Sequence, residues 1–156
     1  MAEKILRSLY ARLTQGAADD FVQASIETLL EPSNGVAFRV VVVEFLNTSA
    51  VAPAALANSE VSWSITTDTK AAVAKYDDTD TIMADGYRAQ LLTSGAVLIP
   101  NRFVYKDPTN FLIVEPFVFL QLDSTATGVV NSFDVRLYYE EQKMSEVEIL
   151  RLLANA

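Results

Sequence analysis

The sequence predicts an all-β fold, an eight-stranded antiparallel jelly-roll sandwich with a short helix at each end. Three observations point to it. Short segments of alternating apolar and polar residues recur, turn-forming residues separate them, and apolar residues at helical spacing occur at both ends of the chain. An antiparallel sandwich of eight strands is most simply a jelly roll. We expect one domain, with residues 1–15 as an N-terminal amphipathic helix or arm, 16–144 as the jelly roll and 145–156 as a C-terminal helix.

The N-terminal segment carries apolar residues at the spacing of a helix. Ile5, Leu9 and Leu13 recur every four residues, and the charged residues lie mostly on the other side. Such a helix would pack on the edge of its own domain. The alternative is an arm that docks on a neighbouring subunit, which makes these three residues interface candidates.

Residues 21–30 and 36–46 are predicted to form a β-hairpin. The first segment alternates apolar and polar residues, and the EPSNG sequence that follows supplies turn-forming residues. The second segment is apolar on both faces apart from Arg39 and Glu44, so we expect it to lie centrally in a sheet.

The remaining strands follow at short intervals. The predicted segments are 61–68, 87–92, 96–100, 101–110, 111–122 and 132–141. Trp63 is expected to pack in the core, with ligand stacking as the alternative. Pro116 indicates a bulge or an edge position, and the last two segments are expected to be neighbouring strands joined by a polar turn.

The C-terminal segment has the signature of a capped helix. Ser145 and Glu148 have the spacing of a capping box, in which each side chain accepts a hydrogen bond from the other residue's backbone. The helix 146–154 is too apolar to be fully solvated. Its apolar side chains must pack on this sandwich or on an adjacent subunit, and the interface candidates among them are Ile149, Leu150 and Leu153.

The composition excludes several classes of function. The chain has no histidine and no cysteine, so Ser-His-Asp and Cys-His catalysis and imidazole or thiolate metal sites are ruled out, and we expect neither an enzyme nor a cofactor. A net charge of -8 argues against a specific nucleic-acid partner. Hydrophobic residues make up 51% of the sequence, but no apolar run is long enough to span a membrane. A small domain with more apolar residues than its own core needs is expected to bury the rest against other copies in a homo-oligomer.

One acidic cluster is a candidate cation site. It consists of Asp77, Asp78, Asp80 and Asp85. Closely spaced aspartates can supply oxygen ligands to calcium, but this spacing does not match the twelve-residue calcium loop. A solvated loop is therefore the favoured interpretation, and no metal ligand is predicted.

The last strand and helix carry a family resemblance. A strand reading FDVRLYYEE that leads into KMSEVEILRLL, on a jelly-roll domain with an amphipathic N-terminal segment, resembles the single jelly-roll capsid proteins of icosahedral viruses of archaea and bacteria. The resemblance spans most of the chain as a strand pattern, and its distinctive residues are 133–153. The sequence departs from that family in having no additional domain or long loop for a tower.

This resemblance implies a non-enzymatic structural subunit of the virion shell. The protein would be made in the host cytoplasm and would self-assemble with copies of itself into an icosahedral coat. A second capsid protein and contact with an internal membrane or inner virion layer are further implied partners.

A different class of function stays open. A β-sandwich binding module for carbohydrates or a receptor, assisted by calcium, would use exposed aromatic residues beside an acidic loop. Tyr76, Tyr87 and the aspartates between them are the candidates. A cupin-like enzyme is disfavoured, because its metal site normally depends on histidines.

Overall fold

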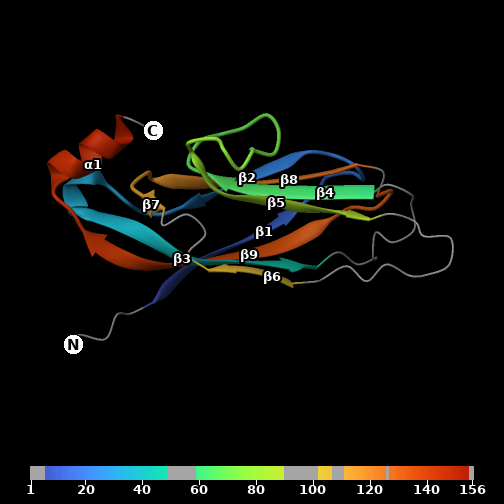
Figure 1. The fold of residues 1–156 in the computed structure, drawn as a ribbon, viewed down its shortest axis with the longest axis horizontal. Helices are drawn as coiled ribbons and strands as arrows, with labels where there is room; N and C mark the ends of the chain where they lie inside the picture. The colour runs from blue at the N-terminus through green and yellow to red at the C-terminus, as the bar shows by residue number, and fades with distance from the viewer. Residues whose placement is uncertain (1–5, 49–58, 90–101, 107–110, 126, 155–156) are drawn as a thin grey trace.

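The computed structural model describes residues 6–48, 59–89, 102–106, 111–125 and 127–154. Figure 1 shows two β-sheets packed face to face, with the single helix of this part at one end. The elements are β1 (Arg7–Thr14), β2 (Val22–Glu27), η1 (Pro32–Asn34), β3 (Val36–Asn47), β4 (Ser59–Thr66), β5 (Thr81–Ala89), β6 (Arg102–Lys106), β7 (Leu112–Ile113), β8 (Phe117–Thr125), β9 (Ser132–Lys143) and α1 (Glu146–Leu153).

The order of the strands is that of a jelly roll. Sheet A has the order β1-β9-β3-β6, with the two-residue β7 also paired to β3, and sheet B has the order β2-β8-β4-β5. The pairing is nested and antiparallel: β1 with β9, β2 with β8, β3 with β6 and β4 with β5. A long hairpin that is rolled up gives this pattern, because its two arms stay paired while the chain passes repeatedly between the sheets. The predicted fold class is confirmed.

The predicted N-terminal helix is wrong where the structure describes it. Residues 7–14 form strand β1, which pairs with β9 from Arg7 opposite Tyr139 to Thr14 opposite Ser132. Leu9 and Leu13 fit a strand as well as a helix, because with Ala11 they recur at every second position and face the core. Pairing with the long strand β9 satisfies the backbone hydrogen-bonding groups of residues 7–14, and this favours a strand over a helix.

The two predicted strand pairs are also wrong. Strand β2 belongs to sheet B and β3 to sheet A, so residues 21–46 cross between the sheets and do not form a hairpin. The crossing runs through η1, and Gly35 has a left-handed φ of 60° that a side chain rarely adopts. In the same way β8 and β9 lie in opposite sheets.

The segment 111–122, predicted as one strand, is divided in two. Strand β7 ends at Ile113 in sheet A, and β8 begins at Phe117 in sheet B. Pro116 lies between them, where its missing N–H removes no ladder hydrogen bond. The predicted strand at 96–100 lies outside the described residues, whereas those at 61–68, 101–110 and 132–141 correspond to β4, β6 and β9.

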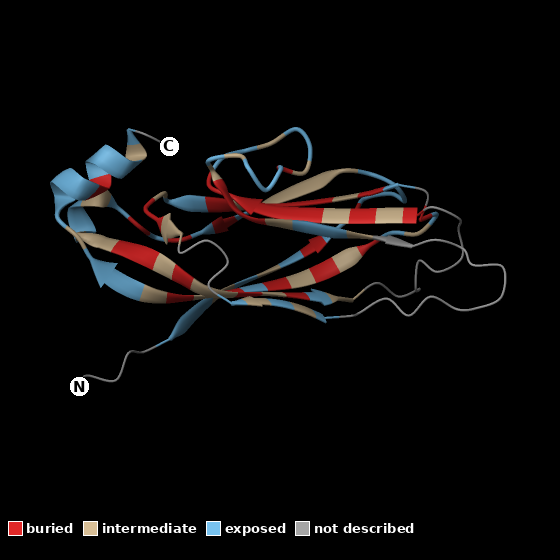
Figure 2. Ribbon diagram, viewed as in Figure 1, coloured by how far each residue is buried: buried red, intermediate tan, exposed pale blue. Residues whose placement is uncertain are grey.

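The core lies between the two sheets. Figure 2 shows that buried residues alternate with less buried ones along β3 and β9, as expected for strands with one face on the core. Trp63 is only 1% exposed and contacts four aromatic rings, so its predicted place in the core is confirmed.

Helix α1 closes one end of the sandwich. The predicted capping box of Ser145 and Glu148 is present. Ile149 is 1% exposed and forms a small second core with Ala37 and Val114. Among the described residues, no helix has both the length and the apolar character needed to span a membrane.

Candidate functional site

The outer face of sheet A is a ladder of charged pairs. Opposite charges face one another across adjacent strands because the antiparallel registers of β1, β9, β3 and β6 place them side by side. The pairs are Arg12 with Asp134 at 2.6 Å, Arg102 with Glu44 at 2.5 Å and Arg39 with Glu140 at 3.1 Å. The hydrogen bond from Arg12 holds the pKa of Asp134 below its usual range. Asp134 therefore stays ionised near neutral pH.

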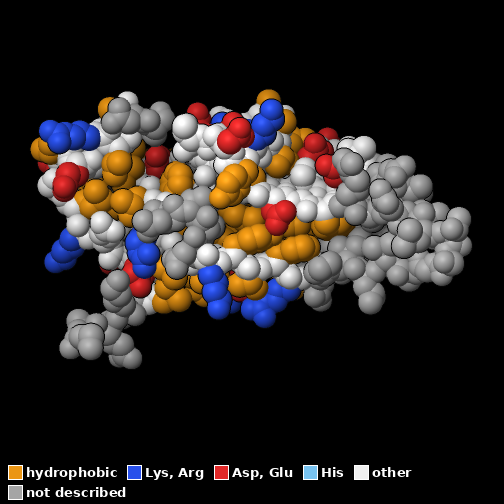
Figure 3. Space-filling model, viewed as in Figure 1, with side chains coloured by type: hydrophobic (Ala, Val, Ile, Leu, Met, Phe, Trp, Pro, Cys, Tyr) orange, Lys and Arg blue, Asp and Glu red, His pale blue; other side chains and the backbone are white. Residues whose placement is uncertain are grey.

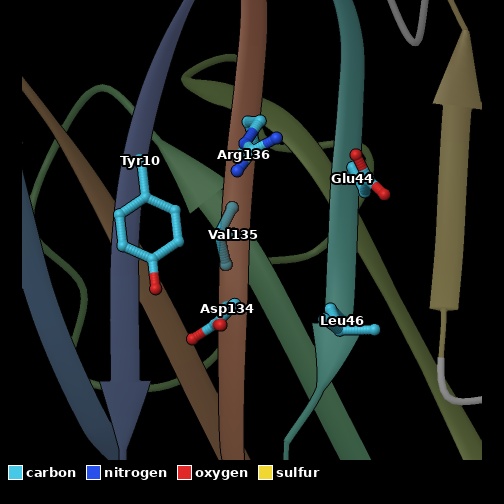
Figure 4. Close-up of a pocket in the computed structure, with 6 residues that line it drawn as sticks. All are labelled: Tyr10, Glu44, Leu46, Asp134, Val135 and Arg136. Carbon is cyan, nitrogen blue, oxygen red and sulfur yellow. The ribbon is translucent and has the colours of Figure 1, made fainter.

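A hollow of about 150 Å³ lies in the middle of this face (Figure 4). Tyr10 contributes from β1, three residues from β9 and two from β3. The lining residues are Tyr10, Glu44, Leu46, Asp134, Val135 and Arg136. Small-molecule pockets usually measure about 300–1,000 Å³. The hollow is thus too small for most metabolites and has the size and mixed chemistry to receive one side chain of a partner.

The outer face of sheet B is partly covered by the chain itself. The loop 67–80 folds over it, as Figure 1 shows above β4 and β8. The Ala74 backbone N–H donates to Ser64 Oγ at 2.9 Å, and Ser64 donates to Gln121 at 2.6 Å. Gln121 in turn donates to Thr66 at 2.8 Å and to Gln23 at 3.0 Å. This buried polar network fixes the loop to the sheet.

The four aspartates of the candidate cation site do not converge on one point, and three of them bond to different partners. Asp80 forms an ion pair with Lys70 at 2.8 Å, and Asp78 accepts a hydrogen bond from the Lys75 backbone at 3.2 Å. Asp85 lies in β5 and accepts a hydrogen bond from the Tyr105 hydroxyl. The fourth, Asp77, is exposed in the loop. Among the residues that the structure describes, no three acids form a group that could hold a metal ion.

The two tyrosines of the binding-module alternative do not share a surface. Tyr76 is 69% exposed in the loop over sheet B. Tyr87 instead packs against the core, with its ring stacked at 6.2 Å on Phe103 and 6.0 Å from Trp63. Burial raises the pKa of Tyr87 to about 12. These residues therefore do not form one aromatic platform for a sugar.

Glu115 is a half-buried carboxylate that the sequence pattern did not single out. It lines a hollow of about 350 Å³ with Lys70, Asp80 and three other residues. Burial raises its pKa above the ordinary value of 4.5, although its carboxylate accepts a hydrogen bond from the Val114 backbone at 3.0 Å. The only feature of the sequence that could have indicated a buried Glu115 is its place between an apolar run and Pro116. A second carboxylate, Asp80, is already paired with Lys70.

Replacing Glu115 with Gln is expected to raise the free energy of unfolding at pH 7. Burial raises the pKa of Glu115 in the folded state, so its ionisation lowers the free energy of unfolding at pH values above this raised pKa. Below about 4.5 the carboxyl is protonated in both the folded and the unfolded chain, and this loss disappears. The gain of Glu115→Gln over wild type should thus shrink as the pH falls from 7 to 4. Urea unfolding at several pH values measures it. A gain independent of pH would contradict the expectation.

The structure places the six interface candidates in different surroundings. Leu9 and Leu13 pack against the core between the sheets, and Ile149 and Leu153 belong to the small core under α1. Leu150 is 49% exposed. Ile5 lies outside the described residues. An interface role for these residues stays a prediction.

An exposed leucine with a left-handed backbone lies at the same end as α1. Leu29 has φ of 59° and is 74% exposed. Its neighbours are fixed: the Thr28 hydroxyl donates to the Glu115 carbonyl at 2.7 Å, and Leu30 is buried. A non-glycine residue in this conformation costs about 1–2 kcal/mol. The fold alone does not require leucine here, since asparagine or glycine would fit better.

Comparison with known proteins gives matches only at the level of solved structures. No protein-family model matches the sequence, and no curated protein matches it. The chain is similar to a chain of the naturally occurring empty particles of cowpea mosaic virus, the top component, with 9% identity, a TM-score of 0.46 and coverage of 93% of this chain and 89% of that one. A chain of tomato aspermy virus matches with 12% identity, a TM-score of 0.43 and coverage of 90% and 82%.

Proposed function

We propose that this chain is a structural capsid subunit that assembles with copies of itself into an icosahedral virion shell. The observation that carries the proposal is the nested strand order from β1 to β9. Jelly rolls of this kind occur in viral capsid proteins, lectins and cupins.

The chemistry of the chain favours the capsid among them. A cupin metal site normally uses histidines, and the sequence has none. A lectin site would present aromatic rings beside a cation or polar cluster, but Tyr87 packs against the core and Asp85 bonds to Tyr105. The apolar residues exposed on sheet A and around α1 are instead features of a surface that contacts other proteins.

Purification at several concentrations, followed by light scattering and negative-stain electron microscopy, tests this function. We expect particles, rings or sheets much larger than the 17.1 kDa subunit. Salt and pH should be varied, because charged faces make association sensitive to both. A monomer at all concentrations that binds a member of a glycan array would support the binding-module alternative and overturn the proposal.

A further inference from the structure

We propose that copies of this chain associate head to tail, with the α1 end of one copy seated on the outer face of sheet A of the next. This inference rests on the proposed function and names the surfaces that would carry self-assembly. The α1 end is defined by its exposed apolar residues, Leu29, Phe117, Val147 and Leu150. The sheet A face is the outward side of β1, β9, β3 and β6.

The sheet A face is positive in a negative protein. Its outward positions carry five basic residues, Arg12, Arg39, Arg102, Lys106 and Arg136, and three acidic residues, Glu44, Asp134 and Glu140. Each of the three acids is paired with an arginine of the same face. The excess comes from Lys106 and Arg136, whereas the whole chain has a net charge of -8. Figure 3 shows Lys and Arg side chains along the side of the molecule formed by this sheet.

The α1 end has the opposite charge. Its acidic residues include Glu27, Glu31, Glu115, Glu146 and Glu148, and its basic residues include Lys143 and Arg151. The ion pairs Lys70–Asp80 and Arg7–Glu141 add no net charge. All of them lie at the end of the sandwich where β2 and β9 finish, β3 and β8 begin and α1 packs. Opposite potentials on two surfaces steer them together and set their register. The two surfaces of one chain are therefore complementary to each other, and neither is complementary to itself.

Both surfaces also offer apolar area. At the α1 end, Leu29 is 74% and Val147 is 59% exposed. On the sheet A face, Tyr10 is 52%, Val104 45% and Leu46 37% exposed. Tyr10 and Leu46 line the hollow of about 150 Å³, which has room for a single side chain. Glu44, Asp134 and Arg136 line the same hollow, so apolar and charged side chains are interspersed on this face.

The backbone at Leu29 supports a contact role for this residue. A left-handed φ of 59° is unfavourable for leucine, and the side chain gains nothing from burial within its own subunit. Burial against a second copy would compensate for the strain. Because the two surfaces differ, the interface is heterologous, and such interfaces generate closed rings or open arrays. Either product suits a shell-forming subunit.

Two sets of substitutions test the two surfaces. The end variant is Leu29→Asn with Leu150→Asn, and the face variant is Lys106→Glu with Arg136→Glu. We expect each to weaken association at least about tenfold in sedimentation velocity, while Leu29→Asn alone leaves the melting temperature equal to or above that of wild type. Matched controls are Val130→Asn, an exposed apolar residue elsewhere, and Lys75→Glu, a cation in the loop over sheet B. Both controls should associate as wild type does.

Mixing the two variants distinguishes head-to-tail association from other arrangements. The end variant keeps an intact sheet A face, and the face variant keeps an intact α1 end, so the mixture should form heterodimers and nothing larger. If wild type assembles and either variant assembles equally well, this inference fails and the proposed function stands. A wild type that stays monomeric at every concentration overturns both. A wild type that assembles, but whose sheet A face binds heparin in preference to another copy, overturns this inference alone.

Discussion

Replacing Trp63 with Ala is expected to lower the free energy of unfolding by about 3–5 kcal/mol, the usual cost of removing a large aromatic side chain from a core. Trp63 is 1% exposed and sits between the two sheets. Its ring centroid lies 4.7 Å from that of Phe103, 5.2 Å from Phe133 and 5.5 Å from Phe45. These three rings belong to β6, β9 and β3, so the substitution leaves a cavity where sheet B meets sheet A.

Urea unfolding followed by circular dichroism measures this effect. Fluorescence is unsuitable, because Trp63 is the only tryptophan in the sequence. The matched control is Tyr76→Ala, which removes an aromatic ring that is 69% exposed and should change stability by less than about 0.5 kcal/mol. A loss below about 1 kcal/mol for Trp63→Ala would contradict the placement of this residue at the centre of the core.

Alternation along the sequence predicted the faces of the strands but not their partners. In β9, Phe133, Val135, Leu137 and Tyr139 are buried, as the period of two required. The same alternation cannot say which strand lies beside β9, and the assumption that neighbours in sequence pair was wrong twice. Pairing in a jelly roll is long-range: β9 lies between β1 and β3. Local turn chemistry carries no information about such partners.

The N-terminal segment shows how tertiary contacts override a local pattern. Ile5, Leu9 and Leu13 fit a helical stripe, but residues 7–14 instead complete the edge of sheet A by pairing with β9. The residues between them, Ser8, Tyr10 and Arg12, then alternate outward. In this arrangement Arg12 forms an ion pair with Asp134 at 2.6 Å. The C-terminal capping box was predictable because it depends on residues three apart.

The candidate surfaces were only partly predictable. The apolar character of α1 indicated that it needs a packing partner, and the structure shows that Ile149 finds one inside the subunit while Leu150 stays exposed. The ladder on sheet A and the left-handed Leu29 could not be predicted. The ladder depends on strand register, and the conformation of Leu29 depends on how Thr28 and Leu30 are held.

A buried polar network at the end of the sandwich opposite α1 gives a second large effect. Gln15 is 2% exposed, and its carbonyl oxygen accepts hydrogen bonds from the Asn131 backbone at 2.9 Å and from the Asn131 side chain at 3.0 Å. Its amide nitrogen donates to Ser124 Oγ at 2.9 Å and to the Asp20 carbonyl. One side chain thus connects the end of β1 with β8 and with the start of β9.

Replacing Gln15 with Ala is expected to lower the free energy of unfolding by about 2–4 kcal/mol, because it leaves the Asn131 N–H and other buried polar groups without partners. Amide hydrogen exchange should also become faster at residues 124–131. In this segment the Asn131 side chain donates to the Thr127 hydroxyl, and the Thr127 backbone N–H donates to Asp19. Gln142→Ala is the matched control, since that glutamine is exposed near the end of β9. Equal stability of the two variants would show that water replaces the lost hydrogen bonds, and that β1 is held by its ladder to β9 and its apolar face alone.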